Sequence, residues 1–210
     1  MLPSSRRAFT LIEMLTVMLI IAILAGIVLS VNGLVQNKAA RTRAEAEMKS
    51  LSVACESYKI DFGNFPRNTD TDALNARADL DPTDAKYKAA GKYLYIALSG
   101  DTDANGKVDP KEGKNYASDL FKPSVLKTTK DAGGSITGVE YIKDPFDNPY
   151  GYSTIGVAAE EAFADALRTN SAASRPASAG GYNPTFDLWS TGGTAGKSGT
   201  AGQAKWVKNW

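Results

Sequence analysis

A long apolar stretch near the N-terminus constrains the fold of this chain more than any other feature of its sequence. Within Phe9–Val31 the one charged side chain is Glu13. The uncharged part, Met14–Val31, is long enough to cross a bilayer as a helix, and it is longer than the apolar region of an ordinary signal peptide. We therefore expect a single membrane-spanning helix. Arg6 and Arg7 precede the stretch, so the positive-inside rule places the N-terminus in the cytoplasm and the C-terminus outside.

The remainder of the chain is polar enough to form a soluble domain. Mean hydropathy is −0.25 over the 210 residues although one stretch is strongly apolar, and 22% of the residues are charged. This length suits one modest globular domain beside the membrane segment rather than several domains. The net charge of +1, with no basic run beyond the first few residues, predicts no nucleic-acid partner.

The sequence contains no histidine, which argues against an enzyme. The commonest general base, the Ser-His and Cys-His nucleophile pairs and His-based zinc sites are all excluded. There is also no nucleophile-elbow motif and no Gly-rich phosphate loop. The single cysteine, Cys55, forms no intramolecular disulfide; we interpret it as a small buried apolar residue, with an intermolecular disulfide as the alternative.

Beyond Val31 the apolar residues recur at helical spacing, with charged residues between them. These apolar positions are Leu34, Val35, Met48, Leu51, Ala54, Cys55 and Tyr58. Gly63 and Pro66 are typical stop signals, so the pattern predicts one continuous helix from about residue 11 to 61. The apolar stripe of so long a helix needs a partner, and we expect a head domain containing a sheet to cover it.

The remaining sequence predicts the elements of this head. Residues 68–91 are polar and predict a loop with short helical turns, and an apolar run at 93–98 predicts a short helix. Residues 139–155 predict a strand, a turn and a second strand, and residues 157–168 predict a helix. The small, Pro-interrupted sequence at 171–181 predicts a flexible loop.

The segment Arg6–Leu15, RRAFTLIEML, resembles the class III signal of type IV prepilins and type II secretion pseudopilins. The resemblance implies that a prepilin peptidase cleaves between Ala8 and Phe9 and methylates the new amine, so that N-methyl-Phe9 begins the mature chain. The family usually has glycine where this chain has Ala8, which is small enough for processing to be expected. Glu13 then occupies the family's acidic position. In a filament core we expect it to pair with the Phe9 amine of a neighbour, since a buried charge is tolerated when paired.

Three further segments resemble the major pseudopilin of type II secretion: ACESYKIDFGNFP at 54–66, DPFDNPYGY at 144–152 and TFDLWS at 185–190. The implied fold is the α+β type IV pilin fold, in which a long N-terminal helix, first transmembrane and then amphipathic, packs on a small antiparallel sheet. The implied parts are a leader peptide at 1–8, a transmembrane and filament-core helix at 9–31, an amphipathic helix at 32–62 and a periplasmic head at 63–210.

The resemblance implies a structural subunit that assembles into a periplasmic helical filament for type II protein secretion. The alternative is a type IV pilin of a surface pilus for adhesion, motility or DNA uptake. Many such pilins close a C-terminal loop with a cysteine pair, which this chain lacks. The implied partners are further copies of the chain, the prepilin peptidase, the minor pseudopilins and an inner-membrane assembly platform. The implied location is the inner membrane, with the N-terminus cytoplasmic and the head periplasmic.

A calcium-binding pattern lies at residues 101–112. The segment DTDANGKVDPKE fits D-x-[DN]-x-[DN]-G-x5-E at every defined position. Calcium prefers several hard oxygen ligands, and Gly106 permits the sharp turn that such a loop needs. The predicted ligands are the side chains of Asp101, Asp103 and Asn105, the carbonyl of Lys107, Asp109 through water, and Glu112 with two oxygens. No long helix clearly follows, so we expect a single calcium-stapled loop; a polar surface loop without metal is the alternative.

The resemblance also bears on the C-terminal tail. Major pseudopilins commonly bind calcium there through acidic residues after the Trp-Ser segment, but residues 191–202 hold no carboxylate here and include Lys197. We therefore expect that site to be absent and calcium to bind at 101–112 instead. The Gly/Ser/Thr-rich run 191–203 is expected to be flexible. The tryptophans, Trp189 among them, are expected to be core or subunit-contact aromatics.

Overall fold

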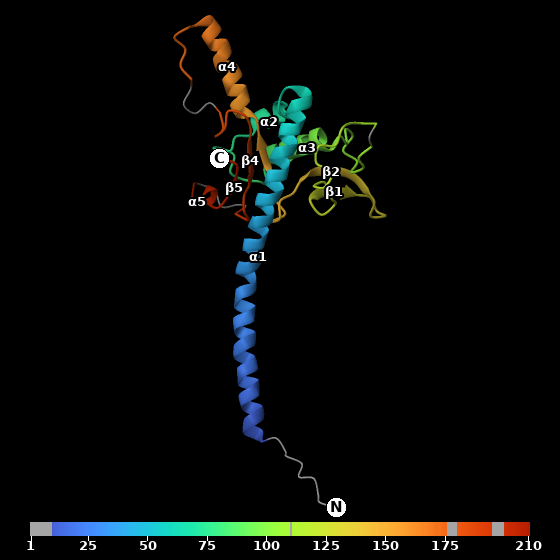
Figure 1. Cartoon of the computed structure of the whole chain (residues 1–210), viewed down its shortest axis with the longest axis vertical. Coiled ribbons are helices and arrows are strands. Elements are labelled where there is room, and N and C mark those ends of the chain that lie inside the picture. Colours follow the sequence, from blue (N-terminus) through green and yellow to red (C-terminus); the bar gives the residue numbers. More distant parts are fainter. Residues whose placement is uncertain (1–9, 110, 176–179, 195–199) are drawn as a thin grey trace, which may run out of the picture. The chain divides into compact units, whose positions relative to one another are not determined.

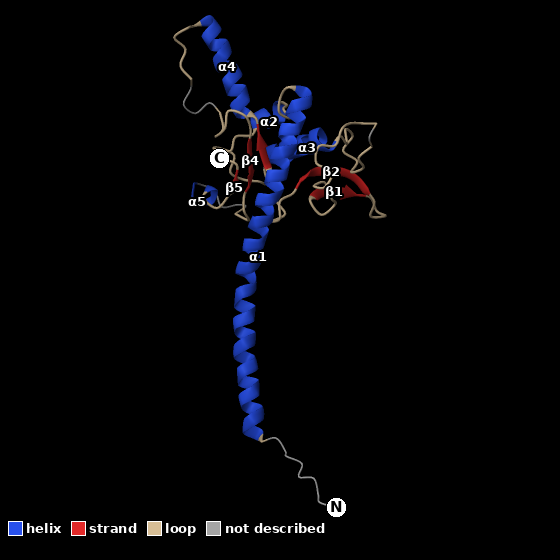
Figure 2. Ribbon diagram, in the orientation of Figure 1, coloured by secondary structure: helices blue, strands red, loops and turns tan. Residues whose placement is uncertain are grey.

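The computed structural model describes residues 10–109, 111–175, 180–194 and 200–210, without the side chains of 27–32, 34, 200 and 201 (Figure 1). The chain divides into two compact units, Met1–Ala40 and Arg41–Trp210. The predicted leader peptide and the predicted cleavage site between Ala8 and Phe9 lie outside the described residues. Figure 2 shows that helix dominates the described part and that the strands are short.

Helix α1, Leu11–Phe62, is the long helix that the sequence predicts from about residue 11 to 61. A reciprocal capping arrangement closes its first turn: the Thr10 N–H donates to Glu13 Oε2 (2.8 Å), and the Glu13 N–H donates to Thr10 Oγ1 (3.3 Å). At the other end Gly63 adopts a positive φ of 81°, and its N–H donates to the carbonyl of Lys59 (2.7 Å). Glycine reaches this left-handed conformation at little cost, which is why the helix ends here.

In the unit Arg41–Trp210, one face of α1 is buried in the core. Its buried apolar positions are Ala44, Met48, Leu51, Ala54 and Cys55. Cys55 is completely buried, and burial raises the pKa of its thiol to about 12. The interpretation of Cys55 as a small core residue is therefore confirmed.

Four further helices belong to the described part of the head: α2, Thr69–Ala73; α3, Ala85–Ser99; α4, Ile155–Thr169; and the short α5, Thr200–Gln203. Helix α3 contains the short helix predicted at 93–98 but begins earlier, because the Asp84 carboxylate caps it by accepting from the Lys86 N–H (2.9 Å). The burial of Tyr87 and Ala90 on the face that also carries Leu94 stabilises the added turns. Helix α4 confirms the helix predicted at 157–168.

The strands form two small antiparallel sheets. One sheet pairs β1, Leu126–Lys130, with β2, Ile136–Ile142. The other has the order β3-β4-β5, with β3 at Gly151–Ser153, β4 at Asp187–Ser190 and β5 at Val207–Lys208. These sheets and the long helix bear out the predicted α+β fold.

The strand, turn and strand predicted at 139–155 are present, but the two strands belong to different sheets. Between β2 and β3 the pairing is reduced to an isolated bridge from Lys143 to Pro149. Pro149 has no N–H to donate, so it cannot extend a ladder. The turn is held instead by Asp144, whose buried carboxylate accepts from the Asn148 N–H (2.9 Å) and from the Ser190 hydroxyl (2.5 Å). Burial raises the pKa of Asp144 to about 6.

The core of the head is rich in aromatic side chains. One cluster surrounds the α1 face and includes Leu188, while a second cluster centres on Trp189. Trp189 is completely buried and stacks on Trp206 with ring centroids 5.9 Å apart. The expectation that Trp189 is a core aromatic is confirmed.

The C-terminal tail is packed on the head where the structure describes it. Thr191 and Thr194 are buried, and the Thr194 N–H donates to the Thr191 carbonyl (3.0 Å). The Arg41 guanidinium of α1 donates to the carbonyl of Lys205. Helix α5, Thr200–Gln203, lies just before Lys205 in the chain. Residues 195–199, in the middle of the run predicted to be flexible, lie outside the described residues.

Candidate functional site

The loop 101–112 brings three of its predicted ligands together. Carboxylate oxygens of Asp101, Asp103 and Glu112 all lie within 4.8 Å of one another. No lysine or arginine among the described residues forms an ion pair with any of the three. A cluster of carboxylates repels itself, so it favours a cation that supplies the missing positive charge.

Asp101 fixes the first half of the loop. Its side chain is completely buried; Oδ2 accepts from the Tyr95 hydroxyl (2.6 Å) and from the Gly106 N–H (2.8 Å). Gly106 has a φ of +83°, and an added Cβ would lie 2.9 Å from Ile136 Cγ2. The turn therefore needs glycine both for its conformation and for space, as the sequence pattern predicts.

Of the remaining predicted ligands, Asn105 contacts this cluster directly. Asn105 Nδ2 donates to Asp103 Oδ2 (2.8 Å), and hydrogen bonding with Asp101 and with Asn105 lowers the pKa of Asp103. The Lys107 N–H donates to Asn105 Oδ1 (2.7 Å). Asp109, predicted to act through water, lies outside the three-carboxylate group and accepts from the Lys111 N–H (2.9 Å).

The chemistry of this donor set fits a hard divalent cation. The contributing side chains are carboxylates and one amide, which are the hard oxygen ligands that such a cation prefers. Val108, where such loops usually carry an apolar residue, is 40% exposed rather than packed in a core. Apart from the buried Asp101, the acidic residues of the loop therefore lie at the surface of the head.

Several residues that support the loop were not predicted from the sequence. Gly100 and Gly113 meet at its two ends, where a Cβ added to Gly100 would lie 2.7 Å from the carbonyl carbon of Gly113. Asp61 of α1 accepts from Lys114 Nζ (2.6 Å) and from the Tyr116 hydroxyl (2.8 Å). Asp61 and Lys114 are far apart in the chain, so no local pattern could have paired them.

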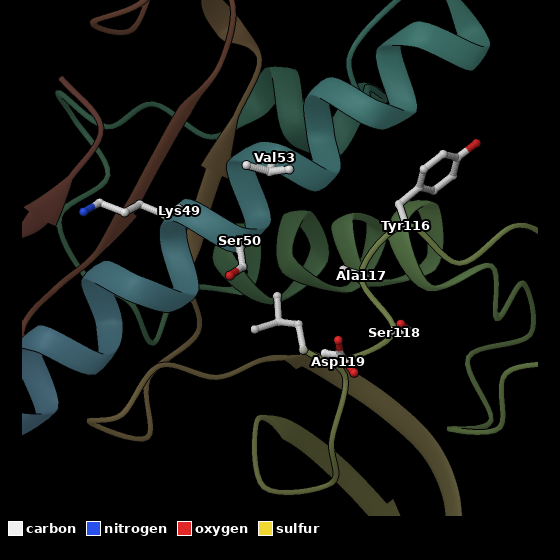
Figure 3. Close-up of a pocket in the computed structure, with 8 residues that line it drawn as sticks. Lys49, Ser50, Val53, Tyr116, Ala117, Ser118 and Asp119 are labelled. Atoms are coloured by element: carbon white, nitrogen blue, oxygen red, sulfur yellow. The ribbon is translucent and has the colours of Figure 1, made fainter.

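A shallow groove of about 450 Å³ lies between α1 and the segment 116–120 that follows the loop. Figure 3 shows the Ser50 side chain of α1 pointing towards this segment. The side chains of Lys49 and Tyr116 point away from the space between α1 and the segment. The groove combines apolar side chains, such as Val53, with hydroxyl and charged groups.

The N-terminal part of α1 exposes many large apolar side chains. Those from Leu11 to Leu24 are between 50% and 85% exposed, and Glu13 lies among them. Exposed apolar surface of this density is typical of segments that associate with lipid or with other protein chains. Among the helices of the described residues, none combines the length and the hydropathy that a membrane span requires.

Comparisons with known proteins identify a family motif near the N-terminus and a relative that matches about half of the chain. Residues 3–29 match the family model described as the prokaryotic N-terminal methylation motif, and this range includes Ala8, Phe9 and Glu13. Over 120 residues the chain is 34% identical to the type II secretion system core protein G of Escherichia coli (strain K12). That alignment covers 55% of this chain and 79% of the relative. No solved structure matches the chain.

Proposed function

The chain belongs to the family of the type II secretion system core protein G, and on that premise we propose that it is a structural subunit of a helical secretion filament. Its role is mechanical, not enzymatic. The observation that carries this proposal is the exposed apolar surface of α1 between Leu11 and Leu24, which lies within the matched methylation motif at residues 3–29. A helix with such a surface gains stability when copies of the chain pack together.

The proposed subunit begins as a precursor in the inner membrane. Residues 1–8 form a cytoplasmic leader, residues 9–31 lie in the bilayer and the head faces the periplasm. The basic leader and the apolar sequence that follows it support this placement. A prepilin peptidase, the minor pseudopilins and an inner-membrane assembly platform are the proposed partners. The 34% identity to a secretion protein favours this role over a surface pilus.

Processing by a prepilin peptidase is the first testable step. When the full chain is co-expressed with an active peptidase, we expect intact mass and N-terminal sequencing to show a mature chain that begins with N-methyl-Phe9. Cleavage removes Arg6 and Arg7 and creates the free amine that the proposed filament contact needs. The natural control is the same chain with an inactive peptidase, which should retain Met1.

Variants at the cleavage site sharpen this test. Ala8→Gly restores the residue that the family usually has before the cut, and it should be processed at least as fast as the natural chain. Replacement of Ala8 by a bulky leucine should block cleavage, because a small residue is needed at this position. A natural chain that still begins with Met1 beside an active peptidase would contradict the proposal.

Glu13 is proposed to pair with the amine of Phe9 on a neighbouring subunit. Within the single chain its carboxylate is exposed and accepts from Thr10 N–H (2.8 Å) and from Thr10 Oγ1 (2.7 Å). The carboxylate thus already lies at the N-terminal end of α1, next to the residue that follows Phe9. A subunit that docked in any other register would leave the Glu13 carboxylate or the Phe9 amine buried without its partner. The proposed contact therefore sets the register between subunits.

The loop 101–112 is proposed to bind one calcium ion. The support is the match to the ligand pattern together with the convergence of Asp101, Asp103 and Glu112. Asn105, the Lys107 carbonyl and Asp109 complete the proposed ligand set. Bound calcium would neutralise the three carboxylates and tie the two ends of the loop together, which stabilises the surface of the head against local opening.

Calorimetric titration of calcium chloride into the full chain in detergent tests this site. We expect one calcium per chain for the natural protein and no binding for Asp101→Ala/Asp103→Ala. The exposed Glu112→Gln variant should bind roughly 10- to 100-fold more weakly, because a charged ligand contact contributes about 1.5–3 kcal/mol. This variant leaves the buried contact between Asp101 and Tyr95 in place.

The matched control removes two exposed carboxylates elsewhere, Asp119→Ala/Asp165→Ala, and should bind calcium as the natural chain does. Equal binding by this control and by Asp101→Ala/Asp103→Ala would show that the loop is not the site.

A further inference from the structure

We propose that Asp61, in the last turn of α1, is a positioning residue for the loop 101–112. Through Lys114 and Tyr116 it holds Glu112 in place, and it thereby couples cation binding at the loop to the C-terminal end of α1. The inference rests on the proposed calcium loop.

The first half of the loop is held by the head without help from α1. Asp101 is buried against Tyr95, and the Ala104 carbonyl accepts from the Val139 N–H of β2 (2.7 Å). The Gly106 backbone packs on Ile136. These contacts fix the positions of Asp101 and Asp103 relative to the β1–β2 sheet.

In the described part of the second half of the loop, Glu112 is exposed. Its backbone N–H donates to the nearby Asp109 carbonyl (2.9 Å), which is a bond within the loop itself. The position of Glu112 therefore depends on the chain that follows it. That chain returns to the head at Gly113, which packs directly on Gly100.

Asp61 secures the residues that follow this return. Its carboxylate accepts from Lys114 Nζ (2.6 Å), two residues after Glu112, and from the Tyr116 hydroxyl (2.8 Å). The Tyr116 N–H donates to the Leu98 carbonyl of α3 (2.8 Å). The Tyr116 ring also packs edge-on against Tyr58 of α1, with centroids 5.5 Å apart. The segment after the loop is thus tied to α1 and α3 together.

This arrangement makes the coupling reciprocal. If the contacts of Asp61 hold Glu112 in place for a cation, then a bound cation must stabilise the contacts of Asp61 by the same free energy. The last turn of α1 carries Phe62, which stacks on Tyr58 at 4.4 Å and is 60% exposed. Cation binding should therefore order the end of the helix as well as the loop.

The variant Lys114→Gln distinguishes two effects of Lys114 on cation binding: its help in positioning Glu112 and the repulsion between its own positive charge and the cation. Removing a positive charge near a cation site strengthens cation binding if long-range electrostatics alone decide. If Lys114 helps to position Glu112, the variant should instead bind calcium more weakly. We expect calorimetry with calcium chloride on the full chain in detergent to show roughly twofold to fivefold weaker binding, which is the effect typical of losing an exposed ion pair. Tyr116→Phe, which changes no charge, should weaken binding in the same direction.

The matched control is Lys111→Gln, which removes the same charge from an exposed residue inside the loop that makes no ion pair with the described residues. It should bind calcium as tightly as the natural chain or more tightly. Hydrogen exchange gives a second measurement: in the natural chain, calcium should slow exchange of the amides at 59–62, and in Lys114→Gln this slowing should be reduced.

The outcomes separate the two proposals. If the natural chain binds no calcium, both the calcium loop and the coupling are wrong. If the natural chain binds calcium but Lys114→Gln behaves as Lys111→Gln does, with equal slowing of exchange at 59–62, the loop stands and the role of Asp61 is overturned. Weaker binding by Lys114→Gln together with unimpaired binding by Lys111→Gln supports the coupling.

Discussion

Replacement of Glu13 by glutamine is expected to leave cleavage before Phe9 intact and to reduce filament yield by about 100-fold or more. In the proposed filament the amine of Phe9 lies in an apolar core and needs the Glu13 carboxylate as its partner. Removing one partner of a buried ion pair costs about 3–5 kcal/mol, and each 1.4 kcal/mol is about a tenfold change in an equilibrium constant. The expected loss therefore reaches several orders of magnitude per subunit contact.

Glutamine is the informative replacement because Glu13 has a second role within its own chain. Its side-chain oxygen closes the first turn of α1 by accepting from the Thr10 N–H. A glutamine side chain can keep this hydrogen bond while losing the charge. A defect in Glu13→Gln therefore reports on the contact between subunits, whereas a defect in an alanine variant would combine both roles.

The assay is sedimentation of filaments and electron microscopy after co-expression with the secretion assembly components. Thr10→Ala is the matched control: it removes the hydroxyl that bonds to Glu13 but keeps the carboxylate, and it should assemble nearly normally. Normal filament yield from processed Glu13→Gln would refute the proposed pair.

Trp189→Ala is expected to destabilise the head by about 3–5 kcal/mol, the usual cost of removing a large aromatic side chain from a core. Trp189 is completely buried, stacks on Trp206 and donates from Nε1 to the Tyr87 hydroxyl (3.1 Å). The variant would leave a large cavity in the second core cluster and would remove the hydrogen bond that the Tyr87 hydroxyl accepts, although that hydroxyl still donates to the Asp79 carbonyl (2.7 Å). For a domain of this size we expect the midpoint of thermal unfolding to fall by roughly 10 °C.

Circular dichroism of the full chain during thermal unfolding measures this effect without relying on tryptophan fluorescence. Trp189→Phe should lose much less stability, because most of the aromatic packing is retained. Leu167→Ala, on the partly exposed surface of α4, serves as the control and should change the midpoint little. An alanine variant as stable as the Leu167 control would contradict the central position of Trp189.

The bounds of α1 could be predicted because every signal for them is local. The apolar stripe, the acidic residue in the first turn and Gly63 at the end all lie in neighbouring sequence. The convergence of the carboxylates in the loop 101–112 could be predicted for the same reason: Asp101, Gly106 and Glu112 follow a fixed spacing. The resemblance to prepilins rests on another local signal, the methylation motif, which the sequence alone also carries.

Features that depend on distant contacts could not be predicted. The strand, turn and strand predicted at 139–155 are typical of a hairpin, but β3 pairs with β4, which is formed by residues more than thirty positions later. The contact between Asp61 and Lys114 joins the end of α1 to a segment beyond α3. The groove beside Val53 exists because the segment 116–120 returns to α1. Such contacts follow from the packing of the whole head.

The contact between Gly100 and Gly113 has a consequence for how this protein can evolve. A loop that leaves and rejoins the fold at one point can change in length or composition without moving the elements on either side, since the entropic cost of a longer closed loop rises slowly. The two glycines themselves are constrained, because a side chain on either would force the backbones apart. Ion-binding chemistry can thus be gained, altered or lost in descendants of this chain while the helix that builds the filament is inherited unchanged.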